Sequence, residues 1–328
     1  MTDLVSVIIP CFNAAHTIDR AIRSIYIQDY PHIELIAVDD GSTDNSKEKI
    51  LSWQEAFSAK GIELQYVFQA NQGSGSAVNT GLKYVTGAFL SLLDADDEYL
   101  PGAISERVSY LQKNPQCDVV RSNGWIVRNE HRHLFVYEDE EKQCPDVFLA
   151  LLRGETNNWA GSYMLRTEPL FSFYPDREIY TSRYGQNLQF LLPLAYKKAC
   201  GFIDKPLMNY IQQPNSLTQT SDADTSKQKS LENAAGFRDI RIHMLRLIVS
   251  DSREQADYLR RIDGAYWRSI LTIAVAFSDK SLIKKSYSNI LQFEKATYQD
   301  KLYYYRTFCP LFFYLLRINH KIRRLLPL

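Results

Sequence analysis

The segment IELIAVDDGSTD, residues 33–44, decides the fold class of this chain. Its first part, IELIAV, has the apolar and β-branched composition of a buried strand, and the pattern stops abruptly at Asp39 and Asp40. Gly41 allows a tight turn, and Thr43 can cap a helix that follows. The segment therefore predicts a strand, a polar turn and a helix in succession.

The same alternation continues on both sides of this segment. Strands are predicted at residues 5–10, 64–68 and 88–93, and Ile18, Ala21, Ile22 and Ile25 share one face of a predicted helix. Strands that alternate with helices at this spacing predict an α/β fold with a mixed, mainly parallel sheet and helices on both faces. Ligands of such sheets bind beyond the carboxyl ends of the strands.

Three polar segments are expected at that edge of the sheet. Asp39-Asp40-Gly41-Ser42 and Asp94-Ala95-Asp96 each follow a strand, and NQGSGS, residues 71–76, precedes a helix. Carboxylates accept hydrogen bonds from a base or a ribose, and paired carboxylates suit a hard cation that also binds phosphates. Taken alone, the first segment can equally be an acidic turn, the second a solvated loop and the third a flexible connection. Together they favour a site for a nucleotide and a metal ion.

Four runs in this order resemble family 2 glycosyltransferases of the GT-A fold: SVIIPCFNA (6–14), IELIAVDDGSTD (33–44), NQGSGSAVNTGL (71–82) and LLDADDEYLP (92–101). The resemblance covers roughly residues 4–115. It implies a nucleotide-diphosphate sugar donor, most often UDP-linked. It also implies a divalent metal, Mn²⁺ or Mg²⁺, at a DxD motif, and transfer of the sugar with inversion at its anomeric carbon.

The resemblance also assigns residues to the site. Asp40 is similar to the residue that contacts the base, Asp94 to the DxD residue near the ribose, and Asp96 to the metal ligand that serves catalysis. Further contacts with the nucleotide sugar are expected from the first loop and the glycine-rich loop, at Pro10, Phe12, Asn71 and Gly73.

One position departs from the family pattern. Such enzymes usually have a Glu-Asp pair at the start of a later helix, with the second acid as general base, and the corresponding residues here are Gln186 and Asn187. An amide cannot accept a proton at neutral pH. Three interpretations stay open: Glu178 or Asp176 is the base, the acceptor needs little assistance, or the protein binds a sugar nucleotide without turning it over.

Two further features concern the acceptor. Trp159 is either a core residue or a platform that stacks on an acceptor sugar near Gln186 and Asn187. The segment 301–328 combines six cations and many aromatic residues with no acid, which suits a helix lying in a membrane interface near a lipid-linked acceptor. A helix packed on the protein and a dimer contact are the alternatives.

Composition limits the classes of protein to which this chain can belong. The formal net charge is +0, which argues against a general nucleic-acid binder. Five cysteines at wide spacings indicate neither a zinc site nor a disulfide framework. No signal-peptide pattern and no apolar run long enough for a membrane span are found, so a cytoplasmic location is expected, with peripheral contact at the inner face of the membrane.

These features combine into one functional hypothesis. A GT-A domain over residues 1–220, with its nucleotide-sugar half at 1–115 and its acceptor half at 116–220, precedes a helical extension at 221–328. The expected reaction moves a hexose from the donor to a hydroxyl of a saccharide or lipid-linked saccharide in polysaccharide assembly. A silent binding or scaffold protein is the main alternative. A nucleotidyltransferase is less suitable, because the first loop lacks a basic, glycine-rich triphosphate motif.

Overall fold

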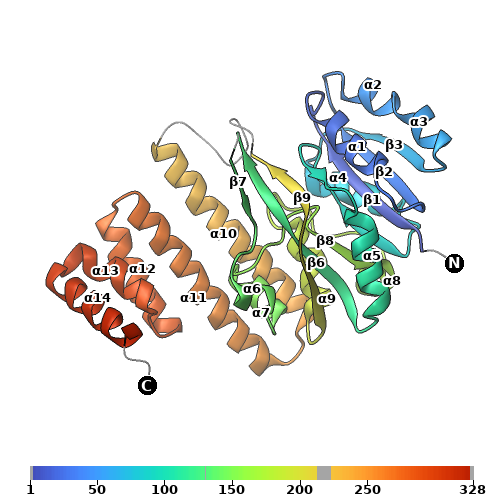
Figure 1. The fold of residues 1–328 in the computed structure, drawn as a ribbon. Coiled ribbons are helices and arrows are strands. Elements are labelled where there is room, and N and C mark those ends of the chain that lie inside the picture. The colour runs from blue at the N-terminus through green and yellow to red at the C-terminus, as the bar shows by residue number, and fades with distance from the viewer. Residues whose placement is uncertain (1–2, 130, 213–222, 326–328) are drawn as a thin grey trace. The chain divides into compact units, whose positions relative to one another are not determined.

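A computed structural model describes residues 3–129, 131–212 and 223–325 of the chain (Figure 1). The chain divides into two compact units, Met1–Ser216 and Leu217–Leu328. The first unit contains the strands and nine helices of the described residues, and the second consists of helices.

The first unit is built on one mixed sheet. In the part of the chain that the structure describes it has nine strands, in the order β3-β2-β1-β4-β8-β6-β9-β5, with β7 paired to β6. The strands, in chain order, are β1 (Val5–Cys11), β2 (Ile33–Asp40), β3 (Glu63–Gln69), β4 (Phe89–Leu92), β5 (Glu98–Tyr99), β6 (Cys117–Arg128), β7 (His131–Leu134), β8 (Tyr163–Arg166) and β9 (Ala199–Ile211). Strands β1 to β4 are parallel, as the sequence predicts, whereas β8 pairs antiparallel with both β4 and β6. The predicted α/β fold class is confirmed.

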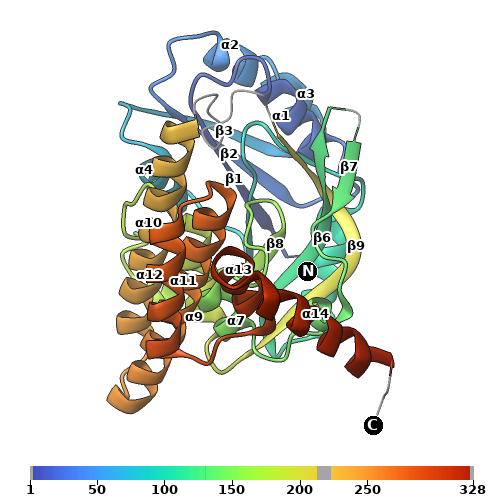
Figure 2. The same cartoon turned by 90° about the vertical axis from the view of Figure 1, so that its left-hand side faces the viewer.

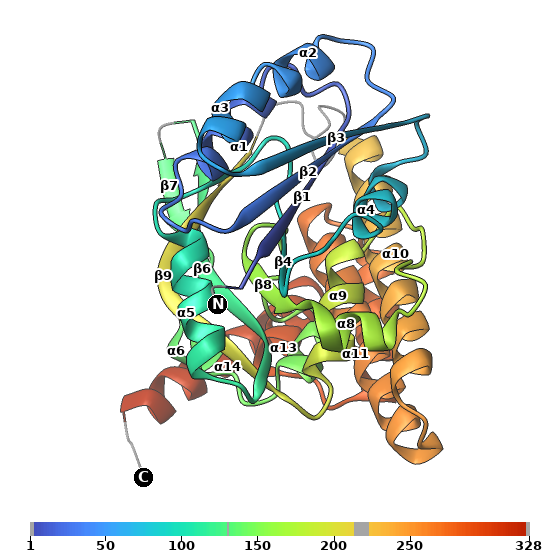
Figure 3. The same cartoon turned by 90° about the vertical axis from the view of Figure 1, so that its right-hand side faces the viewer.

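Helices cover both faces of the parallel part of the sheet. Figure 3 shows α1 (Ile18–Tyr26), α2 (Ser46–Leu51) and α3 (Gln54–Ala59) on one face and α4 (Ser74–Leu82) on the other. The remaining helices of this unit are α5 (Ala103–Lys113), α6 (Asp139–Lys142), α7 (Val147–Arg153), α8 (Thr167–Phe173) and α9 (Gln186–Ala195).

The continuous apolar run of β1 follows from this double covering. Val7 and Ile9 point into one core together with Ile18 and Ile22 of α1. Ile8 points to the opposite face, where a Cβ added to Gly81 of α4 would lie 2.8 Å from its side chain. A strand covered on both faces must be apolar at successive positions rather than at alternate ones.

Strand β6 pairs with β9 along most of its length, with register shifts near Cys117, Ser122 and Asn123. Gly73, with φ at 90°, is the N-cap residue of α4, so the glycine-rich loop leads directly into this helix.

The second unit contains α10 (Ala223–Ile248), α11 (Ser252–Ala276), α12 (Lys280–Phe293), α13 (Tyr298–Phe308) and α14 (Pro310–Leu325). Helices α10, α11 and α12 pack side by side (Figure 2). No helix of the described segments has the length and apolar character needed to cross a bilayer.

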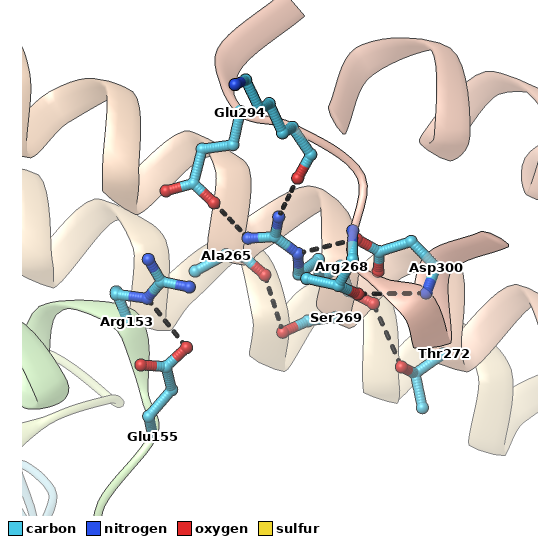
Figure 4. A network of polar contacts seen from close by, with 10 residues as sticks. Arg153, Glu155, Ala265, Arg268, Ser269, Thr272, Glu294 and Asp300 are labelled. Carbon is cyan, nitrogen blue, oxygen red and sulfur yellow. Dashed lines mark hydrogen bonds and ion pairs between the residues drawn. The ribbon is translucent and has the colours of Figure 1, made fainter. Parts of the chain in front are cut away.

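A half-buried arginine network holds three of these helices together (Figure 4). The Arg268 guanidinium on α11 donates to Glu294, to the Asp300 carboxylate at 3.0 Å and to the Lys295 carbonyl at 3.1 Å. Asp300 also forms a capping box with Thr297 at the start of α13. The charged pairs therefore fix the turn between α12 and α13 against α11.

Candidate functional site

The loops after β1 and β2 are joined to each other. The Asn13 amide donates to the Ser42 hydroxyl at 2.9 Å, and the Thr43 amide donates to the Asn13 side-chain oxygen at 2.8 Å. Phe12 directly precedes Asn13 in the first loop and is 52% exposed. Pro10 lies at the end of β1 and is half-buried. The structure thus places Pro10 and Phe12 on a fixed loop at the carboxyl edge of the sheet.

Asp40 anchors the glycine-rich loop. Its carboxylate is buried and accepts hydrogen bonds from the Gln69 side chain at 2.7 Å, the Gln72 amide at 2.9 Å and the Gly73 amide at 2.7 Å. A carboxylate has about four lone-pair sites, so one acceptor position of Asp40 has no partner among the described residues. Asn71 and Gly73 are exposed beside it.

Gly41 is required for this arrangement. Its φ is 78°, and a Cβ at this position would lie 2.8 Å from the Asn71 backbone nitrogen. Any larger residue would both strain the backbone and push the glycine-rich loop away from β2. The sequence suggests close approach of a ligand at Gly41, and the structure shows that a neighbouring loop approaches it as well.

Three carboxylates gather in the turn after β4. Burial and the charge of Asp96 raise the pKa of Asp94 to about 7, and burial raises the pKa of Asp96. Burial and the charges of Asp94 and Asp96 raise the pKa of Asp97 well above its usual value. The Asp97 Oδ1 accepts from the Ile211 amide at 2.9 Å, whereas its Oδ2 is buried without a partner in the described structure. Repulsion between neighbouring carboxylates of this kind is typical of a site that binds a cation.

The carboxylates of this turn fit a divalent cation that also binds oxygen atoms of the ligand. Within residues 3–129, 131–212 and 223–325, no group of three His, Cys, Asp or Glu side chains is arranged to hold a metal. Magnesium-type sites commonly use one or two carboxylates together with substrate phosphates, and the turn offers the half-buried Asp94 and Asp96. The unsatisfied Asp97 oxygen adds negative charge behind them.

The donor-side segments lie close together. Strands β2 and β4 flank β1, so the ends that hold Asp40 and Asp94 are roughly 10 Å apart. The N-terminus of α9 approaches the same edge, because the Gln186 amide donates to the Ser74 hydroxyl at 3.2 Å. The structure therefore brings Asp40, the glycine-rich loop and the start of α9 to one place.

The amide pair of α9 is engaged in hydrogen bonds. Asn187 accepts from the Tyr163 hydroxyl at 2.7 Å, and Gln186 also donates to the Ser182 carbonyl at 2.9 Å. Tyr163 is fully buried, and its pKa is raised well above the usual value by burial and by the charge of Asp94. Tyr163 thus holds Asn187 by a hydrogen bond and lies within the electrostatic influence of Asp94. Neither the sequence pattern nor the spacing indicated this tyrosine.

The carboxylates suggested as the base lie elsewhere. Glu178 forms an ion pair with Lys83 at 2.9 Å, and Arg177 donates to the Val85 carbonyl at 2.9 Å, so this segment covers the C-terminal end of α4. The glycine-rich loop is at the other end of α4, roughly 13 Å away along the helix. Asp176 is exposed in the same segment. The structure does not bring either carboxylate to the acidic turn.

Trp159 is part of an aromatic wall near the acidic turn. Its ring stacks on Tyr210 with centroids 5.6 Å apart and planes at 14°, and it contacts Phe135 at 4.4 Å. Burial and the charges of Asp97, Asp94 and Asp96 raise the pKa of Tyr210 to about 12, so this tyrosine lies beside the carboxylates. Tyr210 is a site residue that no sequence pattern indicated.

Two buried arginines hold the loop that bears Trp159. Arg107 donates to the Gly161 carbonyl at 2.6 Å and to the Ser122 hydroxyl at 2.8 Å, and Arg121 donates to Thr156. Burial lowers the pKa of both guanidinium groups. Arginines are rarely buried without a carboxylate, so sequence patterning places them on the surface and misses this role.

Comparison with known proteins agrees with this geometry. The model of glycosyl transferase family 2 matches residues 6–171, about half of the chain. The UDP-Glc:alpha-D-GlcNAc-diphosphoundecaprenol beta-1,3-glucosyltransferase WfgD of Escherichia coli is 37% identical over 126 residues, which are 38% of this chain and 47% of that protein. Matches to three uncharacterized glycosyltransferases of Rickettsia span only 25%, 45% and 39% of those proteins.

Two solved structures share the fold over most of the chain. Residues 1–349 of TarS from S. aureus, in complex with UDP-GlcNAc, have a TM-score of 0.53 and 18% identity, covering 92% of this chain and 90% of that one. The mannosyltransferase PcManGT from Pyrobaculum calidifontis, in complex with GDP-Man and Mn²⁺, has a TM-score of 0.51 and 17% identity, covering 99% and 88%. With the family model matched through the strands and loops that form the site, the chain belongs to glycosyl transferase family 2.

Proposed function

We propose that this chain transfers a hexose from a nucleotide-diphosphate sugar to a hydroxyl of a saccharide or lipid-linked saccharide, with inversion at the anomeric carbon. The observation that supports it best is the meeting of the Asp40-anchored loop, the acidic turn and the start of α9 at one sheet edge. UDP is the preferred nucleotide in this proposal, since TarS and WfgD are described with UDP-sugars.

Each part of the site has a task in this reaction. Asp40, with its remaining acceptor position, binds the base, while Pro10 and Phe12 line the first loop beside it. Asn71 and Gly73, exposed in the glycine-rich loop, line the donor side of the site. Asp94 contacts the ribose, and Asp96 holds a divalent cation, as the Mn²⁺ of the PcManGT complex suggests. When bound, that cation would neutralise charge on the leaving diphosphate.

The acceptor is proposed to bind on the other side of the acidic turn. The wall formed by Trp159 and Tyr210 offers apolar ring surface beside the carboxylates, which suits a sugar ring. The amides of Gln186 and Asn187 can donate to or accept from its hydroxyl groups.

The test is release of nucleoside diphosphate from a panel of UDP-, GDP- and dTDP-sugars, with Mn²⁺ and with a chelator. We expect metal-dependent release from one donor, increased by a saccharide acceptor. If no donor is cleaved but one nucleotide binds with metal, the silent binding protein is favoured instead, as the hydrogen-bonded amide pair at Gln186 and Asn187 already suggests. If nothing binds, the proposed function is wrong.

Replacing Glu178 with glutamine should leave turnover within about twofold of the wild type. Its ion pair with Lys83 is exposed and at the far end of α4, and such surface pairs contribute about 1 kcal/mol or less. Rates under saturating donor, compared with those of Asp176→Asn, check this. A loss of tenfold or more in either variant would restore a carboxylate of this segment as the base.

We also propose peripheral membrane contact through α14. Leu311, Phe312, Tyr314 and Leu315 are exposed on this helix, and Arg306 and Arg317 are the exposed cations around them. Aromatic and aliphatic side chains with flanking cations suit the interface of an anionic bilayer.

Vesicles test this contact directly. We expect flotation of the full chain with vesicles containing anionic lipid, weakened by salt and by replacing Leu311 and Phe312 with serine. Replacing the exposed Leu291 of α12 with serine is the matched control. Equal flotation of all variants would contradict the proposal.

A further inference from the structure

A cavity lies beside the segment that leaves the acidic turn, and none of the residues assigned to the donor lines it. Its volume is about 690 Å³, which is within the range of small-molecule sites. It is formed by α1, by Trp53 and by the segment that leaves the acidic turn, and the residues that matter are Arg20, Arg23, Ile27, Trp53, Leu100 and Pro101. Its wall is mainly apolar, with two arginines on one face of α1.

The acids of this cavity are already engaged. Asp19 accepts from the Lys49 ammonium at 2.6 Å and from the Trp53 indole at 3.1 Å. Glu98 accepts from the Asn209 amide at 2.6 Å, and its nearest approach to Arg20 is 3.9 Å, beyond hydrogen-bond distance. Glu98 is thus the ion-pair partner of Arg20, whereas neither carboxylate pairs with Arg23.

The unpaired positive charge of this cavity is that of Arg23. Arg23 is exposed and has no ion pair or hydrogen bond with any described residue. Arg20 donates to the Asp96 carbonyl at 2.5 Å, but its Nε is buried without an acceptor among the described residues. The cavity therefore combines apolar walls with a positive charge that lacks a partner, and an anion is its electrostatic complement.

We propose that this cavity binds a small organic anion, a phosphate monoester or carboxylate on an apolar ring. The anion pairs with Arg23, and the ring packs on Ile27, Leu100 and the indole of Trp53. Arg20 lines this cavity and also donates to the Asp96 carbonyl, so it lies between the bound ligand and the acidic turn.

The test uses phenyl phosphate and the full chain with a chelator present, so that metal-dependent nucleotide binding does not contribute. We expect saturable quenching of tryptophan fluorescence with a dissociation constant below about 1 mM, and weaker binding at high salt. Trp53→Phe should remove the fluorescence change while calorimetry still detects binding. Benzoate in place of phenyl phosphate tells whether phosphate or carboxylate is preferred.

Variants separate this site from the donor site. Arg23→Gln should weaken phenyl phosphate at least about fivefold, whereas Arg128→Gln, an exposed arginine at the end of β6, should not change it. Asp40→Asn should also leave it unchanged. The proposal is overturned if binding does not saturate, if phenol binds as tightly as phenyl phosphate, or if Arg23→Gln and Arg128→Gln behave alike. None of these results depends on transferase activity.

Discussion

Asp96→Asn reduces turnover of the nucleotide sugar by at least about a thousandfold and removes its dependence on Mn²⁺, if the proposed site is correct. The substitution keeps the shape of the side chain but removes the charge that would hold the cation. A cation at a leaving diphosphate contributes several kcal/mol to the transition state, and each 1.4 kcal/mol is about tenfold in rate. Turnover is measured by nucleoside diphosphate release with saturating donor.

The same variant should not be destabilised when metal is absent. The charge of Asp96, together with burial, raises the pKa values of Asp94 and Asp97, so an uncharged side chain at position 96 relieves that repulsion. We expect the melting temperature of the metal-free protein to stay equal or rise. This separates a lost function from a lost fold.

Two controls test whether the effect is specific to Asp96. Asp29→Asn, an exposed acid outside the site, should keep wild-type turnover and metal dependence. Addition of UDP and Mn²⁺ together should raise the melting temperature of the wild type but not of Asp96→Asn. Wild-type turnover with unchanged Mn²⁺ dependence in Asp96→Asn would contradict the assignment of the metal ligand.

Asp40→Ala should weaken nucleotide binding at least about tenfold and also destabilise the protein. The Gln72 and Gly73 amides and the Gln69 side chain lose their acceptor together, and a hydrogen bond to a charged group contributes about 1.5–3 kcal/mol. Without its anchor the glycine-rich loop loses the fixed position that a nucleotide needs. Calorimetric titration with UDP and urea unfolding followed by circular dichroism measure the two effects.

Glu34→Ala is the matched control for this prediction. Glu34 lies at the other end of the same strand, is equally buried, and accepts from the Thr86 amide at 2.8 Å and hydroxyl at 2.7 Å and from the Gly87 amide at 3.2 Å. Its removal should cost similar stability and leave UDP affinity unchanged. Equal loss of affinity in both variants would show that Asp40 acts through stability alone.

The parallel half of the sheet follows from sequence alone. Strands such as β1 and β2 are mainly apolar on both faces because both faces are covered, and an acidic turn begins where β2 leaves the sheet. The position of Asp40 and of the acidic turn at one edge follows from the parallel order, since carboxyl ends of parallel strands meet. These are local patterns, so they can be recognised in the sequence without knowledge of the tertiary structure.

The acceptor side was decided only by the tertiary structure. Strands β8 and β9 contribute Tyr163 and Tyr210, which meet Asn187 and the acidic turn across sequence separations that no local pattern records. Glu178 is near Asn187 in sequence, yet its segment turns to the opposite end of α4. Whether a charged residue lies at a surface, a core or a site depends on which distant segments pack around it, as the buried Arg107 and Arg121 also show.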